Sequence, residues 1–166
     1  QVTNLNSIFN GATSFNQPIG NWATGFCDNF SYMFYEAISF NQDISDWSFP
    51  PSYNRPIETD FTKMFMGATS FNQDISSWSV VGVYKMLGMF WGATSFNQPL
   101  GNWSLTGTNG TWNGVYDVRW MFRDASSFNQ DLSNWDTSNI DYCEGFSANT
   151  PSWSLPKPNF TNCNPN

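Results

Sequence analysis

The stretch MFMGATSFNQDISSW, residues 64–78, is one of five similar copies of the same pattern in this chain of 166 residues. The copies are spaced 25 to 32 residues apart, a period that indicates stacked repeats, in which each unit is too small to bury its own apolar face and packs against its neighbours. The other copies are IFNGATSFNQPIGNW from Ile8, MFYEAISFNQDISDW from Met33, MFWGATSFNQPLGNW from Met89 and MFRDASSFNQDLSNW from Met121. The phenylalanine before Asn-Gln is at positions Phe15, Phe40, Phe71, Phe96 and Phe128.

The repeat runs through nearly the whole chain, so we expect a single body without a linker. We predict a five-copy repeat solenoid over residues 1–147 and a C-terminal capping segment of the same domain over residues 148–166. Three residues before the Met-Phe pair, a further apolar position is expected to face the core. It is occupied by Leu5, Phe30, Phe61, Met86, Val118 and, in the last coil, Tyr142.

Within one unit the apolar residues follow helical spacing. Met64, Phe65, Ala68 and Phe71 lie at i, i+1, i+4 and i+7, which predicts about two turns of helix. The helix should end at Asn-Gln, because in two copies a proline follows, and a residue before proline is pushed out of the helical region. The segment up to the tryptophan is then short and extended. The expected fold is therefore an α/β solenoid of stacked coils, each with a short helix and short extended strands.

The string V-x-x-M-x-x-M-F-x-x-A-x-x-F-N-Q-D-I-S-x-W resembles the repeat of the BspA-like leucine-rich-repeat surface proteins, over residues 2 to about 147. The resemblance implies an LRR-like solenoid on a secreted or surface-anchored protein, with adhesion or host contact as its role. The chain departs from that pattern by its longer connections at two places and by lacking an acidic turn after most of its tryptophans.

Composition narrows the class of partner. The net charge is −7, aromatic residues make up 19% and charged residues 11%, so the chain should fold. The six Lys and Arg residues are scattered, which argues against nucleic acid. No apolar run approaches the roughly 20 residues needed to cross a bilayer, so we expect no membrane span in this chain.

Cysteines and sequons point to an oxidising, extracellular setting. Cys143 and Cys163 are expected to form a disulfide that closes a short C-terminal loop, and such pairs suit secreted proteins. Cys27 takes a position that holds valine in other copies, so we expect a buried free thiol rather than a reactive one. Candidate glycosylation sites are Asn109, the strongest, and Asn29, Asn102 and Asn159.

Two longer connections, residues 48–63 and 104–120, both lie between the tryptophan and the next Met-Phe pair. Insertions in repeat proteins often line the binding face. The alternative is a stiff loop whose aromatic side chains fold back on the body. The candidate binding residues in these connections are Phe49, Tyr53, Arg55, Trp112 and Tyr116.

A second candidate surface comes from positions that vary between copies beside the Met-Phe pair. Variable positions should face solvent, and exposed Tyr, Met and Trp side chains are typical of contact surfaces. The alternative is that neighbouring loops cover them. The candidates for binding or assembly are Tyr32, Tyr35, Met66, Trp91 and Trp120.

Catalytic signals are weak. The chain has no histidine, the commonest general base, and its cysteines lack metal spacing. Asp43 and Asp74 hold equivalent places in adjacent coils and could bind calcium or form a glycosidase-like pair, but proline takes that place in other copies, which favours a turn. We expect no enzyme, no cofactor and no catalytic residue. The tryptophans of the repeat are interpreted as core rather than as sugar-stacking residues.

The first coil starts without a polar cap, which implies either a fragment of a longer surface protein or a coil that another copy covers. The function expected from the sequence is non-enzymatic adhesion or ligand recognition at an extracellular or cell-surface location, with a surface or matrix protein or glycan as partner. The alternative is a structural subunit of an extracellular filament or coat, formed by head-to-tail stacking of copies.

Overall fold

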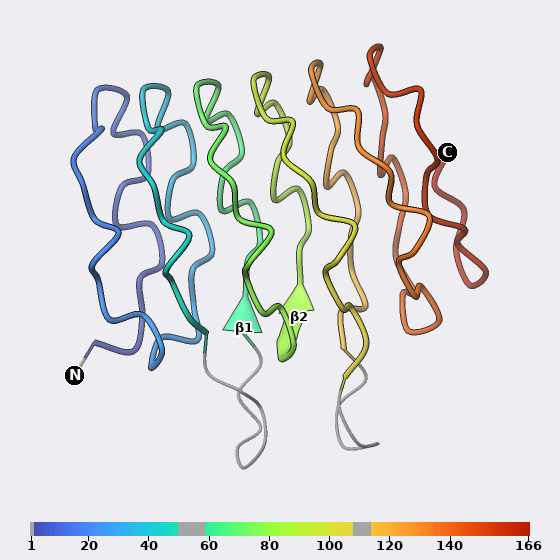
Figure 1. Ribbon diagram of the computed structural model, residues 1–166, viewed down its shortest axis with the longest axis horizontal. Coiled ribbons are helices and arrows are strands. Elements are labelled where there is room, and N and C mark those ends of the chain that lie inside the picture. Colours follow the sequence, from blue (N-terminus) through green and yellow to red (C-terminus); the bar gives the residue numbers. More distant parts are fainter. Residues whose placement is uncertain (1, 50–58, 108–113) are drawn as a thin grey trace.

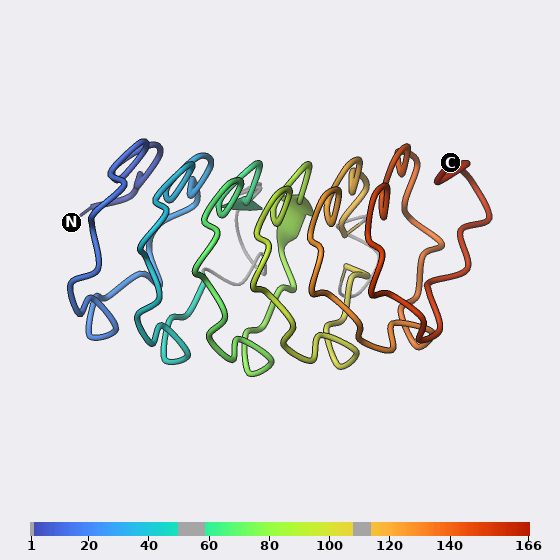
Figure 2. The same cartoon turned by 90° about the horizontal axis from the view of Figure 1, so that it is seen from above.

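The computed structural model describes residues 2–49, 59–107 and 114–166. The chain winds into coils that lie side by side in sequence order, with the two ends of the chain at opposite ends of the row (Figures 1 and 2). Backbone hydrogen bonds join the coils at five successive interfaces, which makes six coils. The first five each contain one copy of Phe-Asn-Gln, and the sixth contains Trp153 at the same place.

Main-chain groups on one side of each coil set the register of the stack. At every interface four N–H groups of one coil, at alternate residues, donate to carbonyls of the next coil; between the first two coils the donors are Leu5, Ser7, Phe9 and Gly11. Two short parallel strands form within this pattern, β1 (Thr59–Asp60) and β2 (Val83–Lys85). Isolated parallel bridges extend it to both ends, at Asn4–Asn29, Asn29–Asp60, Lys85–Asp117 and Asp117–Tyr142.

The expected helix is absent, and with it the α/β solenoid: the described residues contain no helix and only two short strands. Two residues at equivalent places around the Met-Phe pair of each coil have positive φ, for example Lys63 at 53° and Gly67 at 72° in the third coil. Left-handed residues at this spacing stop a right-handed helix. The segment consists instead of consecutive tight turns, such as Met64 N–H to Phe61 O and Met66 N–H to Lys63 O, while the intervening N–H groups bond to the neighbouring coil.

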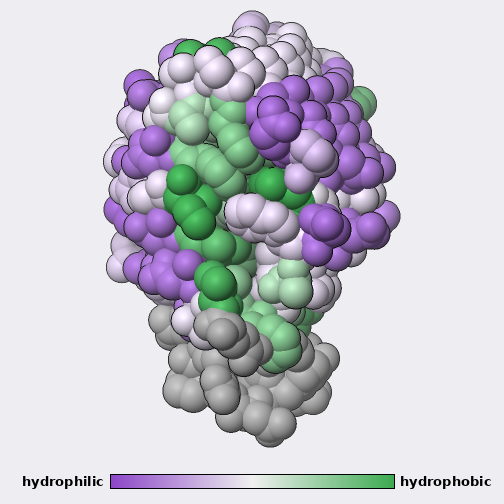
Figure 3. Space-filling model, turned by 90° about the vertical axis from the view of Figure 1, so that its left-hand side faces the viewer, coloured by the Kyte–Doolittle hydropathy of each residue, from purple (hydrophilic) through white to green (hydrophobic). Residues whose placement is uncertain are grey.

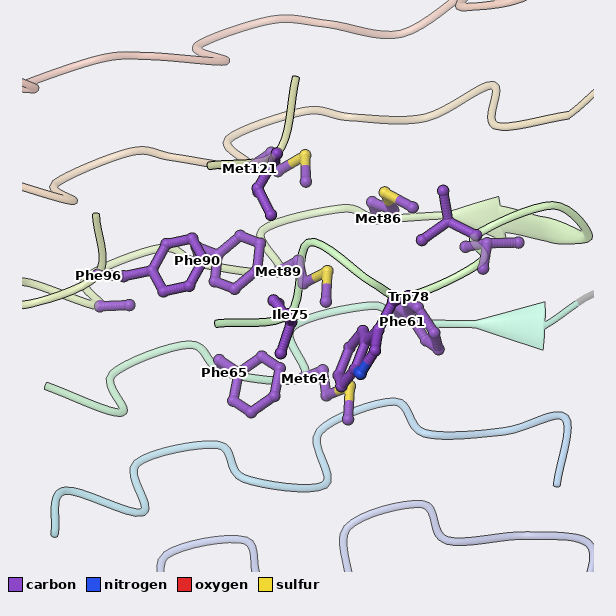
Figure 4. Close-up of a cluster of buried hydrophobic side chains, with 14 of the residues drawn as sticks. Phe61, Met64, Phe65, Ile75, Trp78, Met86, Met89, Phe90, Phe96 and Met121 are labelled. Atoms are coloured by element: carbon purple, nitrogen blue, oxygen red, sulfur yellow. The ribbon is translucent and has the colours of Figure 1, made fainter. Parts of the chain in front are cut away.

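The core is built from columns of identical side chains. Rings of the Met-Phe phenylalanines stack from coil to coil, with centroids 5.4 Å apart between Phe34 and Phe65. The phenylalanines before Asn-Gln form a parallel column, 5.9 Å apart between Phe40 and Phe71. Figure 4 shows members of the two columns, Phe65, Phe90 and Phe96, together with methionines and Trp78 of the middle coils. The aromatic side chains at the repeated positions therefore pack against their equivalents in the neighbouring coils.

The Asn-Gln pair forms a polar ladder rather than a helix end. The Oδ1 of Asn72 accepts the backbone N–H of Asn97 at 2.9 Å and the Nε2 of Gln98 at 2.9 Å, both from the next coil. Equivalent bonds link each of the first five coils to the one that follows. This ladder explains why Asn-Gln is kept in every copy.

The sixth coil is shifted by one residue relative to the sequence alignment. Phe122 N–H donates to Phe146 O, where inner coils have a methionine as acceptor, so Cys143 and not Tyr142 takes the buried position three residues earlier. Tyr142 is 44% exposed. Cys143 bonds to Cys163 with a Cα–Cα distance of 5.9 Å, which confirms the expected disulfide and ties the return side of the last coil to its start.

Candidate recognition face

Seven side chains from four successive coils form a row beside the Met-Phe positions, here called the ring row. Each is partly exposed. Their positions alternate between the left-handed residue before the Met-Phe pair and the residue after it, so the backbone turns direct them away from the core. The row consists of Tyr32, Tyr35, Lys63, Met66, Trp91, Trp120 and Arg123.

Cations lie over the rings of this row. The Nζ of Lys63 lies 5.5 Å from the ring centre of Tyr32 and 6.0 Å from that of Trp91. The Arg123 guanidinium lies 5.0 Å from the Trp91 ring centre. Such cation–π contacts contribute about 0.5–1 kcal/mol at exposed sites. These contacts favour one arrangement of the row, which reduces the cost of ordering it on binding.

Asp124 fixes the Trp91 ring from the side. Its carboxylate accepts the Trp91 Nε1–H at 2.9 Å and an N–H of the Asn149 side chain at 2.9 Å. Hydrogen bonds from Asn149 first, and then from Trp91, lower the pKa of Asp124 below its ordinary value. Asp124 is therefore ionised at neutral pH, and its charge offsets that of Arg123, whose Nε lies 3.4 Å away.

Trp120 is accommodated by a glycine of the last coil. A Cβ at Gly145 would lie 2.5 Å from Trp120 Cδ1, so a larger residue there would displace the indole. Trp120 and Trp91 are tilted against each other with centroids 5.8 Å apart. Both predicted tryptophans therefore lie together at the C-terminal half of the row.

A second cluster lies beside the parallel bridges between the coils, and the sequence predicted only part of it. The Nζ of Lys85 lies 4.9 Å from the ring centre of Tyr84 and 5.9 Å from that of Tyr116. A hydrogen bond with Tyr116 raises the pKa of Lys85. The sequence analysis named only Tyr116 of this cluster as a binding candidate. Tyr84 and Tyr116 each precede a residue that pairs with the next coil, Lys85 and Asp117, and this shared position was the signal in the sequence. This tyrosine cluster comprises Tyr84, Lys85, Tyr116, Arg119 and Tyr142.

Arg119 is the anchored cation of the tyrosine cluster. Its guanidinium donates to both oxygens of Asp117, at 3.0 and 2.7 Å, and lies 5.1 Å from the Tyr142 ring centre. The hydrogen bond with Asp117, which is 2% exposed, raises the pKa of Arg119. The bidentate pair fixes the position of the guanidinium plane.

Of the residues predicted in the inserted connections, Phe49 and Tyr116 lie in the described part of the chain. Tyr53, Arg55, Trp112 and Asn109 lie outside the described residues. Phe49 is 8% exposed and packs edge-on against Phe30, Phe61 and Trp78, so it belongs to the core and not to a contact surface. Tyr116 is the described member of this predicted group that lies in the tyrosine cluster.

The aspartates considered for calcium are parts of turns. Asp43 and Asp74 each accept the backbone N–H of the serine two residues later at 2.9 Å, and these bonds lower the pKa of both carboxyls. They line a shallow groove of about 450 Å³ with Gln73 and neighbouring serines. Among the described residues, no group of three or more His, Cys, Asp or Glu side chains could hold a metal ion.

The remaining predicted residues take the following places. The repeat tryptophans Trp47, Trp78, Trp103 and Trp135 are buried, as predicted, and Trp22 in the first coil is partly buried. Trp47 and Trp78 stack at 6.4 Å, and Trp78 Nε1 donates to Ile44 O at 3.0 Å. Cys27 is a buried free thiol, whose pKa is raised by burial.

The candidate glycosylation sites differ in their surroundings. Asn102 and Asn159 are exposed, whereas the Asn29 Oδ1 accepts hydrogen bonds from Ser31. The described residues contain no helix with the length and apolar character of a membrane span.

Comparison with known proteins places the repeat in a family. No match is found among curated proteins or among solved structures. A family model described as Mycoplasma protein of unknown function, DUF285, matches three consecutive segments, residues 1–55, 52–111 and 110–161. Together these segments cover nearly the whole chain. The chain therefore belongs to the DUF285 repeat family.

Proposed function

We propose that this protein is a non-enzymatic recognition protein that binds a partner through the ring row and the tyrosine cluster. The observation that carries the proposal is the gathering of partly exposed rings from successive coils, with cations held between them. Aromatic and arginine side chains dominate the binding energy of many interfaces.

The face suits an elongated partner. Each of four successive coils adds one or two side chains to the row, so contacts repeat in one direction along the stack. Rings can pack on sugar faces or on apolar side chains, and the cations can pair with carboxylates or sulfates. A surface or matrix glycan, or a protein, is the partner class we propose.

We further propose an extracellular or cell-surface location and an adhesive role. The disulfide between Cys143 and Cys163 supports this location, since such bonds persist in oxidising compartments. The resemblance of the repeat to BspA-like surface proteins supports the same role.

The proposal is tested by binding of the wild-type chain and of Trp91→Ala to a glycan array and to immobilised matrix proteins. Loss of the Trp91 ring should weaken binding about tenfold or more. Ile38→Ala is the control, because it removes an apolar side chain that is 46% exposed and lies outside the ring row. Equal binding by wild type and Trp91→Ala, with both folded, would remove the ring row as the site.

A further inference from the structure

Most of the positive charge of this chain gathers on one flank of the stack. Of the five Lys and Arg residues in the described ranges, four belong to the ring row or the tyrosine cluster. They come from three successive coils, the third to the fifth, and are Lys63, Lys85, Arg119 and Arg123. The net charge of the whole sequence is −7. Cations that are scattered along the sequence therefore form a cluster once the coils are stacked.

Rings and cations alternate on this flank. In the ring row, Tyr32, Lys63, Trp91 and Arg123 belong to the second, third, fourth and fifth coils, and each cation lies over a ring of a neighbouring coil. The tyrosine cluster repeats this arrangement, with Lys85 over the rings of two tyrosines. Seen along the stack, polar residues lie on both sides of a hydrophobic middle (Figure 3). Polarity alone therefore does not mark a site, whereas the alternation of rings and cations does.

The lysines and the arginines of this flank differ in how their charge is balanced. Each arginine forms an ion pair with an aspartate of its own coil, Asp117 or Asp124. Lys63 and Lys85 are partly exposed, and neither forms an ion pair with a carboxylate of residues 2–49, 59–107 or 114–166. The two ammonium groups are therefore the cations whose charge is left for an anionic ligand.

The two lysines are close enough to bind one ligand chain. The Lys63 N–H donates to the carbonyl of Leu87 in the next coil, two residues beyond Lys85. With a rise of about 3.3 Å per extended residue and about 4.8 Å between neighbouring strands, their backbones lie roughly 8 Å apart. Two acidic groups of one linear chain can reach both lysines, and the second contact then forms at a high effective concentration.

The composition of this flank favours an acidic glycan over a protein or a nucleic acid. Of the twelve side chains in the ring row and the tyrosine cluster, only Met66 is neither aromatic nor charged, and lysine is depleted at protein interfaces. Nucleic-acid binding depends on neutralising many phosphates, for which two unpaired cations are too few. A sugar offers an apolar face to an aromatic ring, and its carboxylate or sulfate can accept hydrogen bonds from a lysine.

We infer that this flank binds a linear acidic polysaccharide, whose carboxylate or sulfate groups bind Lys63 and Lys85. The inference rests on the proposed recognition function and narrows its ligand to glycans that carry negative charge. Neutral glycans share the sugar faces but lack the groups that the two lysines bind.

Binding of the 166-residue chain to dextran sulfate and to dextran, which share one sugar backbone, tests the need for charge. Surface plasmon resonance on the immobilised protein should show at least tenfold tighter binding of dextran sulfate, and this binding should weaken as salt rises. Polygalacturonate and its methyl ester make the same comparison for carboxylates. The inference is wrong if neither charged polymer binds more tightly than its neutral counterpart, or if polyglutamate or a single-stranded oligonucleotide binds more tightly than both.

Lysine variants test the site itself. Lys63→Gln/Lys85→Gln should bind the charged polymer about tenfold or more weakly, whereas Lys63→Arg/Lys85→Arg should keep most of the affinity. Lys157→Gln is the matched control, because it removes an exposed lysine outside both clusters, and it should bind like wild type. Near-ultraviolet circular dichroism checks that every variant keeps its tryptophan column.

The outcomes separate this inference from the proposed function. Equal losses in Lys157→Gln and in the double glutamine variant would overturn the two-lysine site. A neutral glycan or matrix protein that is bound by wild type, lost in Trp91→Ala and unaffected by the lysine variants would also overturn it, while the proposed function would stand.

Discussion

Two residues in each coil adopt the left-handed conformation, and they decide the local structure. Glycine fills the second of these positions in the first, third and fourth coils, at Gly11, Gly67 and Gly92. The second coil has Glu36 there, at a φ of 54°. Non-glycine residues are rare in this region, so the surrounding main-chain bonds must hold them there.

Two glycine substitutions separate backbone strain from crowding. Gly11→Ala should cost about 1 kcal/mol, because φ is +69° but no atom lies within 4 Å of the added Cβ. Gly145→Ala adds a clash with Trp120 at a φ of +63° and should cost about 1–3 kcal/mol more. Urea unfolding measures both, and equal losses would contradict the close packing at Gly145.

Acid should destabilise the protein through its turn aspartates. Asp43, Asp74 and Asp131 accept hydrogen bonds from serines, and their pKa values are lowered from 3.8. Their contribution to stability is therefore complete above pH 3.8 and is lost as the pH falls through the lowered folded-state pKa values. Thermal unfolding at a series of pH values below about 5 measures the effect.

Asp74→Asn is the matching control for the acid series. The amide oxygen can accept the Ser76 N–H but does not titrate, so the acid dependence of the unfolding temperature should become shallower. A curve parallel to that of wild type would exclude Asp74 as a source of the acid sensitivity.

At the residue scale the sequence predicted burial better than conformation. Invariance inside the repeat correctly placed the tryptophans in the core, and the proximity of Cys143 to Cys163 in the chain correctly paired them. The asparagine ladder was missed because its bonds join residues in different coils, which no local pattern reveals. Glycine at Gly67 and Gly92, inside the expected helix, was a signal against that helix.

At the scale of the element, the expected helix was wrong for a physical reason. Apolar residues at i, i+3 and i+4 face one way both in a helix and in consecutive three-residue turns, so spacing alone does not separate the two. What separates them is the destination of the N–H groups. Here half of them leave the segment for the next coil, as Phe65 N–H does to Met89 O, and a helix cannot provide that.

The tryptophan column supplies a prediction at this scale. Trp78→Phe should cost about 1–3 kcal/mol, because the Ile44 carbonyl loses its Nε1–H donor in a buried place. Trp22→Phe should cost clearly less, since Trp22 lies in the end coil, is only partly buried and donates to no described acceptor. The unfolding free energies of the two variants test this, and equal costs would argue against the buried hydrogen bond.

At the scale of the whole molecule, the row of coils followed from the repeat period, whereas the ends did not. The last coil departs from the repeat at Ser147 and Lys157, and only its bonds to the fifth coil reveal the shift in register at Phe146. The ring row was partly predictable, because its variable positions are partly exposed. The cation–ring contacts of Lys63 and Lys85 required the neighbouring coils to be placed first.

The disulfide should support the last coil and, through it, the whole stack. Cys143 and Cys163 are separated by 20 residues, and closing a loop of that size stabilises a protein by about 3 kcal/mol. Reduction should therefore lower the unfolding free energy, and the Cys143→Ser/Cys163→Ser double variant should be insensitive to reductant. Cys27→Ala should respond to reductant like wild type, which shows that the buried thiol is not involved.

The main-chain bonds between coils have a consequence for what the molecule can discriminate. Because backbone N–H and C=O groups, the asparagine ladder and the buried rings set the spacing, the outward side chains can be exchanged without altering the distance from one coil to the next. A ligand that lies along the stack would contact outward side chains at equal intervals, once per coil. Its length, counted in coils, would then matter as much as its chemical groups, and adding or deleting one repeat would change the preferred length by a single step.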